Sequence, residues 1–341
     1  MSQPTVRQIV LASRPSGPPK PENFRLEQVP MPALPPGGLL FKVLYLSLDP
    51  YMRGRMDDRK SYAKPVGIGE VMTGESVCEV IASDRQGYAP GDIVLAHTGW
   101  RTHAAWDGPA TRKLNPALAP ITTGLGVLGM PGFTAYAGLY VIGKPKPGET
   151  VVVAAASGPV GSLVGQLAKM PGAKAIGIAG GADKCRHVVE DLRFDDCIDH
   201  RAPDFAAKLA AACPKGIDIY FENVGGAIWE AALPLLNTYA RVPVCGLISQ
   251  YSTAGPPSGP NLLPATVREV LTKSLTLRGF INTEFVAEHY ADFLKTVGGG
   301  VADGRIRYRE DIVDGIENAP AAFMGLLQGK NFGKALVRVS H

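Results

Sequence analysis

The chain of 341 residues is longer than one hydrophobic core usually fills, so its length predicts two domains. Hydrophobic residues make up 45% and charged residues 19%, a globular composition that excludes disorder and coiled coil. The net charge of +4 is too small and too scattered to indicate a nucleic-acid partner, and no apolar run has membrane-spanning length. Because the N-terminus does not read as a secretory signal, we expect a cytoplasmic protein.

The cysteines are widely spaced and form no C-x-x-C pair; they are Cys78, Cys185, Cys197, Cys213 and Cys245. An odd number without close spacing argues against a disulfide framework, so we expect reduced thiols. The same spacing argues against a structural four-thiolate zinc site, whose ligands must close one tetrahedron.

The first 125 residues consist of short β-like runs broken by glycine and proline, such as "RQIVLA", "LLFKVLYLSLD" and "GDIVLAHT". This spacing predicts a compact, barrel-like β-domain, with loops at residues 15–21 and 30–38. From about residue 126, β-rich runs alternate with helical ones, which predicts repeated βαβ units around a parallel sheet in an α/β protein. The tail from about residue 302 could continue this sheet or return to the first domain.

The apolar strand "VVVAAA" runs into a glycine turn and then into a helical segment with Pro159 in its first turn. The backbone at Gly158, Pro159, Val160 and Gly161 could approach a pyrophosphate there, because a helix N-terminus favours negative charge. This strand–turn–helix context inside a βαβ run predicts a dinucleotide site. The alternative is a glycine turn without a ligand.

The next strand, "KAIGIAG", ends in Gly180 and Gly181, at the point where an NAD-specific site carries an acidic residue. A phosphate on the adenosine ribose needs room and a cation. The glycines provide the room and Lys184 the cation, so NADP is the expected cofactor. Asp183 weakens this prediction, but just ahead of a helical run it is better placed as the helix N-cap than as a ribose ligand. Lys184 could also be a solvated helix lysine.

Zinc-dependent alcohol dehydrogenases combine a barrel domain with such a nucleotide fold and bind zinc through thiolate, imidazole and carboxylate ligands. In this chain, the "TGES" segment has no histidine, and Cys78, His97 and His103 lack the expected companions. We therefore expect no catalytic metal.

Two metal-free reductase designs remain to be compared. Tyr140 and Lys144 have the Tyr-x-x-x-Lys spacing of short-chain dehydrogenases, but they precede the glycine loop, whereas that design places them after it. In the other design, hydride reaches the β-carbon of a conjugated carbonyl compound and hydroxyl groups stabilise the enolate. Tyr51 and Tyr251 lie in suitable loops, although packing or a surface hydroxyl is the alternative for an isolated tyrosine.

The segment "FENVGG" ends a strand beside the expected cofactor cleft. Asn223 and Gly225 could contact the nicotinamide ribose there. A turn at the start of a helix would also explain the paired glycines.

Seven segments, in order, resemble the zinc-independent medium-chain reductases, which include curcumin reductases, prostaglandin reductases and plant alkenal double-bond reductases. They are "SLDPYMRGRM", "MPGFTAY", "AASGPVGSLVGQLAK", "GIAGGADKC", "FENVGG", "CGLISQY" and "GKNFGKALV". The resemblance covers nearly the whole chain. It implies a GroES-like barrel at residues 1–125, completed by residues 301–341, and a doubly wound Rossmann domain at residues 126–300. It also implies a homodimer that reduces the activated C=C bond of α,β-unsaturated ketones and aldehydes with NADPH and without a metal.

The resemblance further implies roles for individual residues. Tyr251 matches the tyrosine that donates to the carbonyl or enolate, and Tyr51 matches a tyrosine that lines the substrate pocket. Lys184 matches the lysine that binds the 2′-phosphate, and Asn331 matches an asparagine near the cofactor. In "GFINTEF", Phe280 is expected to be an apolar wall of the substrate site, with an ordinary dimer or core contact as the alternative.

Relatives often have a Tyr-Lys pair after the third strand, where the tyrosine helps to hold the 2′-phosphate, but this chain has His200 and Arg201 there. An imidazole and a guanidinium could take over that role, and a surface His and Arg are the alternative. If they bind the phosphate, affinity for NADPH should rise below about pH 6.5, where the histidine gains charge.

Two other functions remain open from the sequence. A quinone reductase of the same architecture would not place deuterium on carbon, so product labelling separates it from an enone reductase. A non-catalytic NADPH-binding protein would bind the cofactor and oxidise none of it when offered enones.

Overall fold

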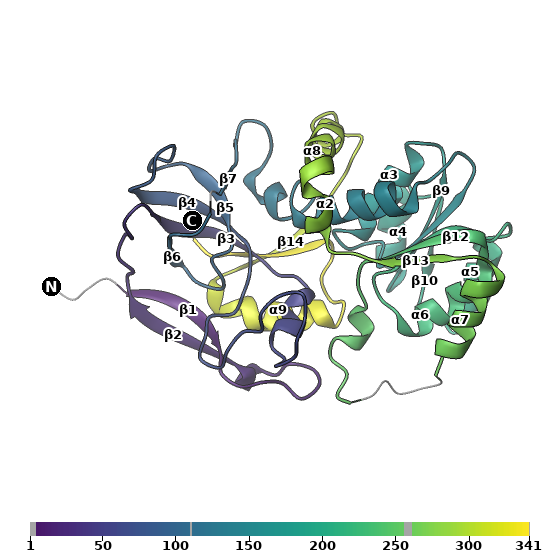
Figure 1. The fold of residues 1–341 in the computed structure, drawn as a ribbon, viewed down its shortest axis with the longest axis horizontal. Coiled ribbons are helices and arrows are strands. Elements are labelled where there is room, and N and C mark those ends of the chain that lie inside the picture. Colours follow the sequence, from purple (N-terminus) through teal and green to yellow (C-terminus); the bar gives the residue numbers. More distant parts are fainter. Residues whose placement is uncertain (1–4, 110, 256–260, 341) are drawn as a thin grey trace. The chain divides into compact units, whose positions relative to one another are not determined.

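The computed structural model describes residues 5–109, 111–255 and 261–340 (Figure 1). The chain divides into two compact units, which we name the terminal unit and the central unit. The terminal unit comprises Met1–Leu125 with Glu310–His341, and the central unit comprises Gly126–Arg309.

The first boundary lies where the sequence predicts it, whereas the second follows Arg309 rather than residue 300. The physical reason is the packing of the segment after the last helix of the central unit. Ile306 is buried in a core cluster of that unit. The backbone N–H of Arg307 donates to the side-chain oxygen of Gln166 at 2.8 Å, which holds this segment against the central unit.

The terminal unit contains a two-stranded and a seven-stranded sheet. Its described strands are β1 (Thr5–Leu11), β2 (Phe24–Pro30), β3 (Leu39–Ser47), β4 (Ser76–Ser83), β5 (Ile93–Ala96), β6 (His103–Trp106), β7 (Arg112–Lys113), β14 (Glu310–Asp314) and β15 (Lys334–Arg338). Its described helices are η1 (Pro21–Asn23), α1 (Tyr51–Arg55), η2 (Ile121–Leu125), η7 (Ile316–Asn318) and α9 (Ala319–Leu327). β1 pairs with β2. The larger sheet has the order β14-β15-β3-β4-β5-β7, with β6 paired to β3.

The C-terminal tail returns to the N-terminal strands and does not extend the parallel sheet of the central unit. β15 runs antiparallel to β3, with Leu336 opposite Ser47, and parallel to β14. The burial pattern of β3 explains its place in the middle of this sheet. Its residues Leu39, Phe41 and Val43 are buried at every second position, as a strand with one face on the core requires.

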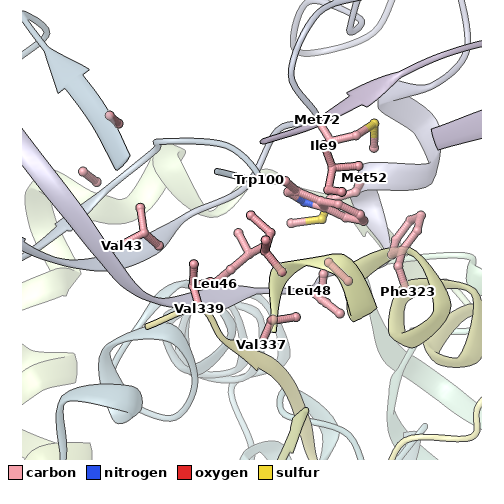
Figure 2. Close-up of a cluster of buried hydrophobic side chains, with 14 of the residues drawn as sticks. Ile9, Val43, Leu46, Leu48, Met52, Met72, Trp100, Phe323, Val337 and Val339 are labelled. Carbon is pink, nitrogen blue, oxygen red and sulfur yellow. The ribbon is translucent and has the colours of Figure 1, made fainter. Parts of the chain in front are cut away.

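Figure 2 shows part of the core of the terminal unit, where the Trp100 indole lies among aliphatic and methionine side chains. Trp100 meets Phe323 of α9 edge to face, with ring centroids 5.6 Å apart. Met52 of α1 is fully buried in the same cluster. The core thereby sets the position of α1, whose first residue is Tyr51.

The central unit alternates strands and helices, as predicted. Its described strands are β8 (Thr150–Ala154), β9 (Lys174–Ala179), β10 (Asp196–Asp199), β11 (Ile217–Phe221), β12 (Leu236–Val244) and β13 (Thr276–Gly279). Its described α-helices are α2 (Met130–Ala137), α3 (Gly161–Lys169), α4 (Ala182–Glu190), α5 (Phe205–Ala212), α6 (Gly226–Ala232), α7 (Leu263–Thr272) and α8 (Val286–Ala302). Shorter helical segments are η3 (Gly138–Gly143), η4 (Leu233–Leu235), η5 (Ile248–Gln250) and η6 (Asn282–Phe285).

The six strands form one parallel sheet in the order β10-β9-β8-β11-β12-β13. Counted along the chain from β8, this is the order 3-2-1-4-5-6 of the doubly wound fold that binds dinucleotides. The order reverses direction at β8, between β9 and β11. Ligands of such sheets bind at this switch point, beyond the carboxyl ends of the strands.

Helices cover both faces of the parallel sheet. Val151 and Val153 of β8 belong to a core cluster with residues of α2, α3 and α8, whereas Val152 and Ala154 belong to a cluster with residues of α5 and α6. Every residue of β8 is buried and all those after Thr150 are apolar, as a strand buried on both faces requires.

α8 is the longest helix in the described ranges, with 17 residues. A helix that spans a bilayer needs about 20 predominantly apolar residues. In the part of the chain that the structure describes, no helix is long and apolar enough to cross a membrane.

Candidate active site

The glycine loop between β8 and α3 is closely packed against its own backbone. A Cβ atom built on Gly161 would lie 2.3 Å from the carbonyl oxygen of Ala155, so only glycine fits there. α3 begins at Gly161 with Val160 as its N-cap, so Pro159 precedes the helix and the prediction that it lies in the first turn is wrong. The amide N–H of Ser162 donates to the carbonyl of Gly158 at 2.9 Å, which closes the turn.

The side chains of His200 and Arg201, which follow β10, lie close to the tip of β9. A Cβ atom built on Gly180 would lie 2.9 Å from His200 Nε2 and 3.0 Å from Arg201 Nε. These nitrogens lie against the position at which an NAD-specific site places its carboxylate. The structure thus brings together the glycine, imidazole and guanidinium that the sequence separates by about twenty positions.

Asp199, which the sequence analysis did not single out, organises this tip. Its Oδ1 accepts hydrogen bonds from the backbone N–H groups of Gly181 and Arg201, both at 2.9 Å. These bonds, with that from Gly181 the largest contribution, lower the pKa of the Asp199 carboxyl. Its place as the last residue of a strand next to β9 was the signal available in the sequence.

The charges at the tip of β9 act on one another. Burial and then the charge of Arg201 lower the pKa of His200, and Lys184 adds a smaller contribution in the same direction.

Asp183 is not the N-cap of α4. Gly181 occupies that position, and Asp183 lies in the first turn of the helix. Asp183 Oδ1 instead pairs with the Arg186 guanidinium at 2.6 Å on the exposed side of the helix.

The loops after β11 and β12 are hydrogen-bonded to each other. Asn223 Nδ2 donates to the carbonyl of Ala154, the last residue of β8, at 2.7 Å. Ser249 donates to the Val224 carbonyl through its backbone N–H, at 3.1 Å, and through its hydroxyl, at 2.5 Å. The carboxyl ends of β8, β11 and β12 therefore form one connected edge of the sheet, to which Asn223 and Gly225 both belong.

Tyr251 follows η5 at this same edge. Its hydroxyl oxygen accepts a hydrogen bond from the backbone N–H of Leu247 at 3.2 Å. A Cβ atom built on Gly246 would lie 3.0 Å from that oxygen, so the phenol lies over a glycine of its own loop. The structure thus places the Tyr251 hydroxyl at the carboxyl end of β12, on the edge where such folds bind their ligands.

Phe280 packs against aromatic residues of the central unit. Its ring centroid lies 6.5 Å from that of Phe221 and 6.2 Å from that of Phe285. A Cβ atom built on Gly138 would lie 2.7 Å from the Phe280 ring, so the ring sits close against η3. Phe280 remains partly exposed, and its role as a wall of the substrate site stays a prediction.

Tyr140 and Lys144 do not form the catalytic pair of short-chain dehydrogenases. The Tyr140 hydroxyl donates to the Leu167 carbonyl at 3.0 Å, and burial raises the pKa of Tyr140 to about 12. A lysine partner would lower that pKa, so the spacing of the two residues reflects local helix composition.

In the terminal unit, a buried ion pair lies next to the segment that contains Tyr51. Lys334 Nζ lies 2.6 Å from Asp49 Oδ1 and donates to the Leu48 carbonyl at 2.8 Å. The Ser47 hydroxyl also donates to Asp49. Both side chains of the pair are almost completely buried, with 2% of Lys334 and 6% of Asp49 exposed. No local sequence pattern indicates this pair, because its members lie 285 positions apart.

The same pair connects the two predicted site segments of the terminal unit. Asp49 precedes Tyr51 by two positions, and Lys334 follows Asn331 by three. Asn331 Nδ2 donates to the Gly333 carbonyl at 2.8 Å, which holds the loop before β15. Burial, and then the charge of Asp49, raise the pKa of Tyr51, so its hydroxyl stays protonated and able to donate.

Comparison with known proteins relates the whole chain to one group of enzymes. Residues 7–114 match a family described as the N-terminal domain of oxidoreductases, and residues 159–297 match one described as zinc-binding dehydrogenases. The NADPH-dependent curcumin reductase of Escherichia coli is 53% identical over 98% of this chain and 97% of its own. The chain belongs to the medium-chain dehydrogenase/reductase family.

Two further members of the family extend this comparison. The 2-alkenal reductase (NADP(+)-dependent) of Nicotiana tabacum is 38% identical over 98% of this chain and 97% of its own. The crystal structure of CurA from Vibrio vulnificus in complex with NADPH superposes with a TM-score of 0.94 at 52% identity, covering 98% of this chain and 99% of that one. The predicted α/β fold, with a Rossmann sheet and a separate β-domain, is confirmed.

One matched description in this medium-chain family names zinc, but the donors in this chain do not fit a zinc site. Cys78 is fully buried, and burial raises the pKa of its thiol. His97 Nδ1 lies 4.0 Å from Glu75 Oε1, and more than half of the histidine side chain is exposed. Within the described ranges, no three His, Cys, Asp or Glu side chains lie close enough together to hold a metal ion.

Proposed function

We propose that the protein reduces the activated C=C bond of α,β-unsaturated ketones and aldehydes with NADPH. The observation that carries this proposal is the 53% identity, over nearly the whole length of both chains, to an NADPH-dependent curcumin reductase. Enones and enals have a carbonyl group that polarises the double bond, and curcumin and 2-alkenals share this chemistry. The substrate class follows from that shared feature.

The proposed cofactor site lies along the carboxyl edge of the parallel sheet. The loop formed by Gly158, Pro159, Val160 and Gly161 would hold the pyrophosphate at the start of α3. The 2′-phosphate would lie at the tip of β9, beside the side chains of Lys184, His200 and Arg201. Further along the edge, the nicotinamide ribose would lie near Asn223 and Tyr251. Asn331 keeps the role that the resemblance implies for it, near the cofactor.

NADPH supplies a hydride to the β-carbon of the bound substrate, which leaves negative charge on the carbonyl oxygen. Tyr251 is proposed to donate a hydrogen bond to that oxygen, the role of a preorganised oxyanion donor. Tyr51 is proposed to line the substrate site with a protonated phenol, and burial raises its pKa further above the ordinary value. Phe280 is proposed as an apolar surface for the substrate.

The proposal is tested by a panel of enones and quinones with NADPH and with deuterated NADPH. We expect turnover of enones and one deuterium on the β-carbon of the product. Turnover of quinones alone, without deuterium on carbon, would identify a quinone reductase. Binding of NADPH without oxidation by any compound would identify a non-catalytic binding protein.

Replacing Lys184 by alanine should weaken NADPH binding about 10- to 100-fold, the effect of losing one charge-assisted hydrogen bond. NADH lacks the 2′-phosphate, so its dissociation constant should change little. Fluorescence titration of both cofactors checks this, with Lys208→Ala as the matched control because Lys208 lies exposed on α5. An equal loss for NADPH and NADH would contradict the phosphate assignment.

The affinity for NADPH should increase as the pH falls, through protonation of His200. In the free protein the pKa of His200 lies below its ordinary value of 6.5, and a bound phosphate would raise it by favouring the charged imidazole. The added affinity is then complete below the pKa of the free protein and is lost as the pH rises through the pKa of the complex. Dissociation constants between about pH 5 and 8 measure this change.

The 2′-phosphate itself takes up a proton near about pH 6, so the comparison with His200→Ala is essential. Asp199, Arg201 and Lys184 act on His200 in both the free and the bound protein and remain in the variant. As the pH falls, we expect the NADPH affinity of the unmodified protein to rise relative to that of His200→Ala. Identical slopes would show that His200 does not meet the phosphate.

We also propose a cytoplasmic homodimer. The edge strand β13 is exposed along its length, and α7 presents Leu263, Val267 and Leu271 to solvent at a spacing of four residues, with Leu271 80% exposed. An exposed sheet edge beside an apolar helix stripe suits a second copy of the same surface.

Light scattering should therefore give twice the mass of one chain. Leu271→Glu should shift the protein toward the monomer, whereas Leu118→Glu should not, because Leu118 is equally exposed but lies in the terminal unit. A monomeric unmodified protein would refute the proposed dimer.

A further inference from the structure

Two cysteines of the central unit contact each other beside the proposed 2′-phosphate site. Cys185 lies in α4 and Cys197 in β10, and their thiols form a side-chain hydrogen bond. Neither is completely buried, so the pair lies near the surface of the unit. The proposed reaction uses neither thiol.

The packing around Gly177 explains why the two sulfurs meet. Cys197 lies opposite Gly177 in the register of β9 and β10, and a Cβ atom built on Gly177 would lie 3.1 Å from Cys197 Sγ. The same built atom would lie 2.8 Å from Val188 of α4. Cys185 precedes Val188 by three positions, so both lie on the face of α4 that covers β9. The absent side chain at position 177 therefore leaves the space in which the Cys197 sulfur reaches α4.

The two thiols have different acidities. The hydrogen bond from Cys197 lowers the pKa of Cys185, and it raises the pKa of Cys197 together with burial. Cys185 also lies one turn from the positive N-terminus of α4, a location that favours a thiolate. A partly exposed, acidic cysteine next to a second thiol is the arrangement of redox-sensitive sites.

We propose that Cys185 and Cys197 form an oxidation-sensitive dithiol, which a hydroperoxide converts to a disulfide that weakens NADPH binding. The link to NADPH rests on the proposed function; the reactivity of the pair does not. The Cys185 thiolate attacks one oxygen of the hydroperoxide, the O–O bond breaks, and an alcohol or water leaves with one proton. Cys197 then attacks the sulfenic sulfur of Cys185, the S–S bond forms, and water leaves. Two thiols are oxidised and one hydroperoxide is reduced, and a dithiol reductant reverses the change.

The disulfide would act on the cofactor through chain segments that both cysteines share with the phosphate site. Lys184 directly precedes Cys185, and His200 follows Cys197 by three positions. An S–S bond of about 2.05 Å is shorter than any hydrogen-bonded contact between two thiols, so it draws α4 toward β10. The space between Lys184 and His200 then narrows, and the 2′-phosphate loses at least one of its cationic contacts.

The reactivity is tested on the full chain with hydrogen peroxide, followed by maleimide blocking, proteolysis and mass spectrometry. We expect a cross-linked peptide pair containing Cys185 and Cys197, which dithiothreitol separates. In Cys197→Ser the reaction should stop at a sulfenic acid on Cys185, which dimedone traps. Cys213→Ser is the matched control, because Cys213 is buried and burial raises the pKa of its thiol to about 11.

The dithiol is refuted if Cys185 remains open to maleimide after peroxide treatment, or if Cys213 reacts as fast as Cys185. The two single variants keep the result interpretable, because dimedone labelling of Cys197→Ser reports Cys185 even where no cross-link can form. Cys185→Ser should abolish both the cross-link and the dimedone adduct.

The effect on the cofactor is tested by titrating NADPH and NADH into the reduced and the oxidised protein. Oxidation should raise the dissociation constant of NADPH at least about tenfold, which corresponds to the loss of one charge-assisted contact. The dissociation constant of NADH should change less. The double variant Cys185→Ser/Cys197→Ser should bind NADPH equally before and after peroxide. An unchanged NADPH constant in protein with a mapped cross-link would overturn the proposed effect. A reduced protein that does not bind NADPH would refute the proposed function instead, and the peptide map would still decide whether the dithiol reacts.

Discussion

Replacing Tyr251 by phenylalanine is expected to lower kcat for enone reduction by about 10²- to 10³-fold, the usual cost of removing one donor to a developing oxyanion. The hydroxyl lies at the carboxyl end of β12, on the ligand-binding edge of the sheet. The NADPH dissociation constant should stay nearly unchanged, because the phenol is assigned to the substrate carbonyl. Steady-state kinetics and fluorescence titration of the same preparation measure the two effects.

The control for this variant is Tyr239→Phe, since Tyr239 is 72% exposed on β12 and touches no part of the proposed site. Tyr251 also accepts a hydrogen bond from Leu247, so loss of the hydroxyl could loosen the loop. Thermal unfolding of the variant therefore accompanies the kinetics. Full activity in Tyr251→Phe would remove this tyrosine from the mechanism.

Replacing Lys334 by methionine should lower the free energy of unfolding by about 3–5 kcal/mol, because it leaves the buried Asp49 carboxylate without its cation. Among the contacts of the described residues, the Asp49 carboxylate would keep the hydrogen bond from the Ser47 hydroxyl. Urea unfolding followed by fluorescence measures the change. We also expect lower activity, because the pair holds together the segments that carry Tyr51 and Asn331.

The exposed pair between Arg7 and Glu317 provides the matched control in the same unit. Its N–O distance of 2.8 Å is close to that of the buried pair, but 40% and 46% of the two side chains are exposed. Glu317→Ala should therefore cost less than about 1 kcal/mol. If Lys334→Met and Glu317→Ala lowered the free energy of unfolding equally, burial of Lys334 and Asp49 would not determine how much this pair stabilises the protein.

The sequence alone determined the layers of this protein and its cofactor class, because those depend on local patterns. Runs in which nearly every residue is apolar mark strands that are buried on both faces. The glycine turn before α3 follows from backbone geometry over a few residues. The missing carboxylate after β9 indicated NADP for the same local reason. The predicted N-cap of α4 was wrong: Asp183 has a side chain suited to an N-cap, but Gly181 occupies that position.

The tertiary structure alone decided which distant residues share a site. β9 and β10 are parallel neighbours, with Ala179 opposite Asp199, so His200 meets Gly180 across the register. Pairing of β15 with β3 brings Lys334 to Asp49, and packing of α4 over Gly177 brings together two thiols that the sequence separates. No local pattern encodes these contacts, because strand order and helix packing are set by burial of the whole core.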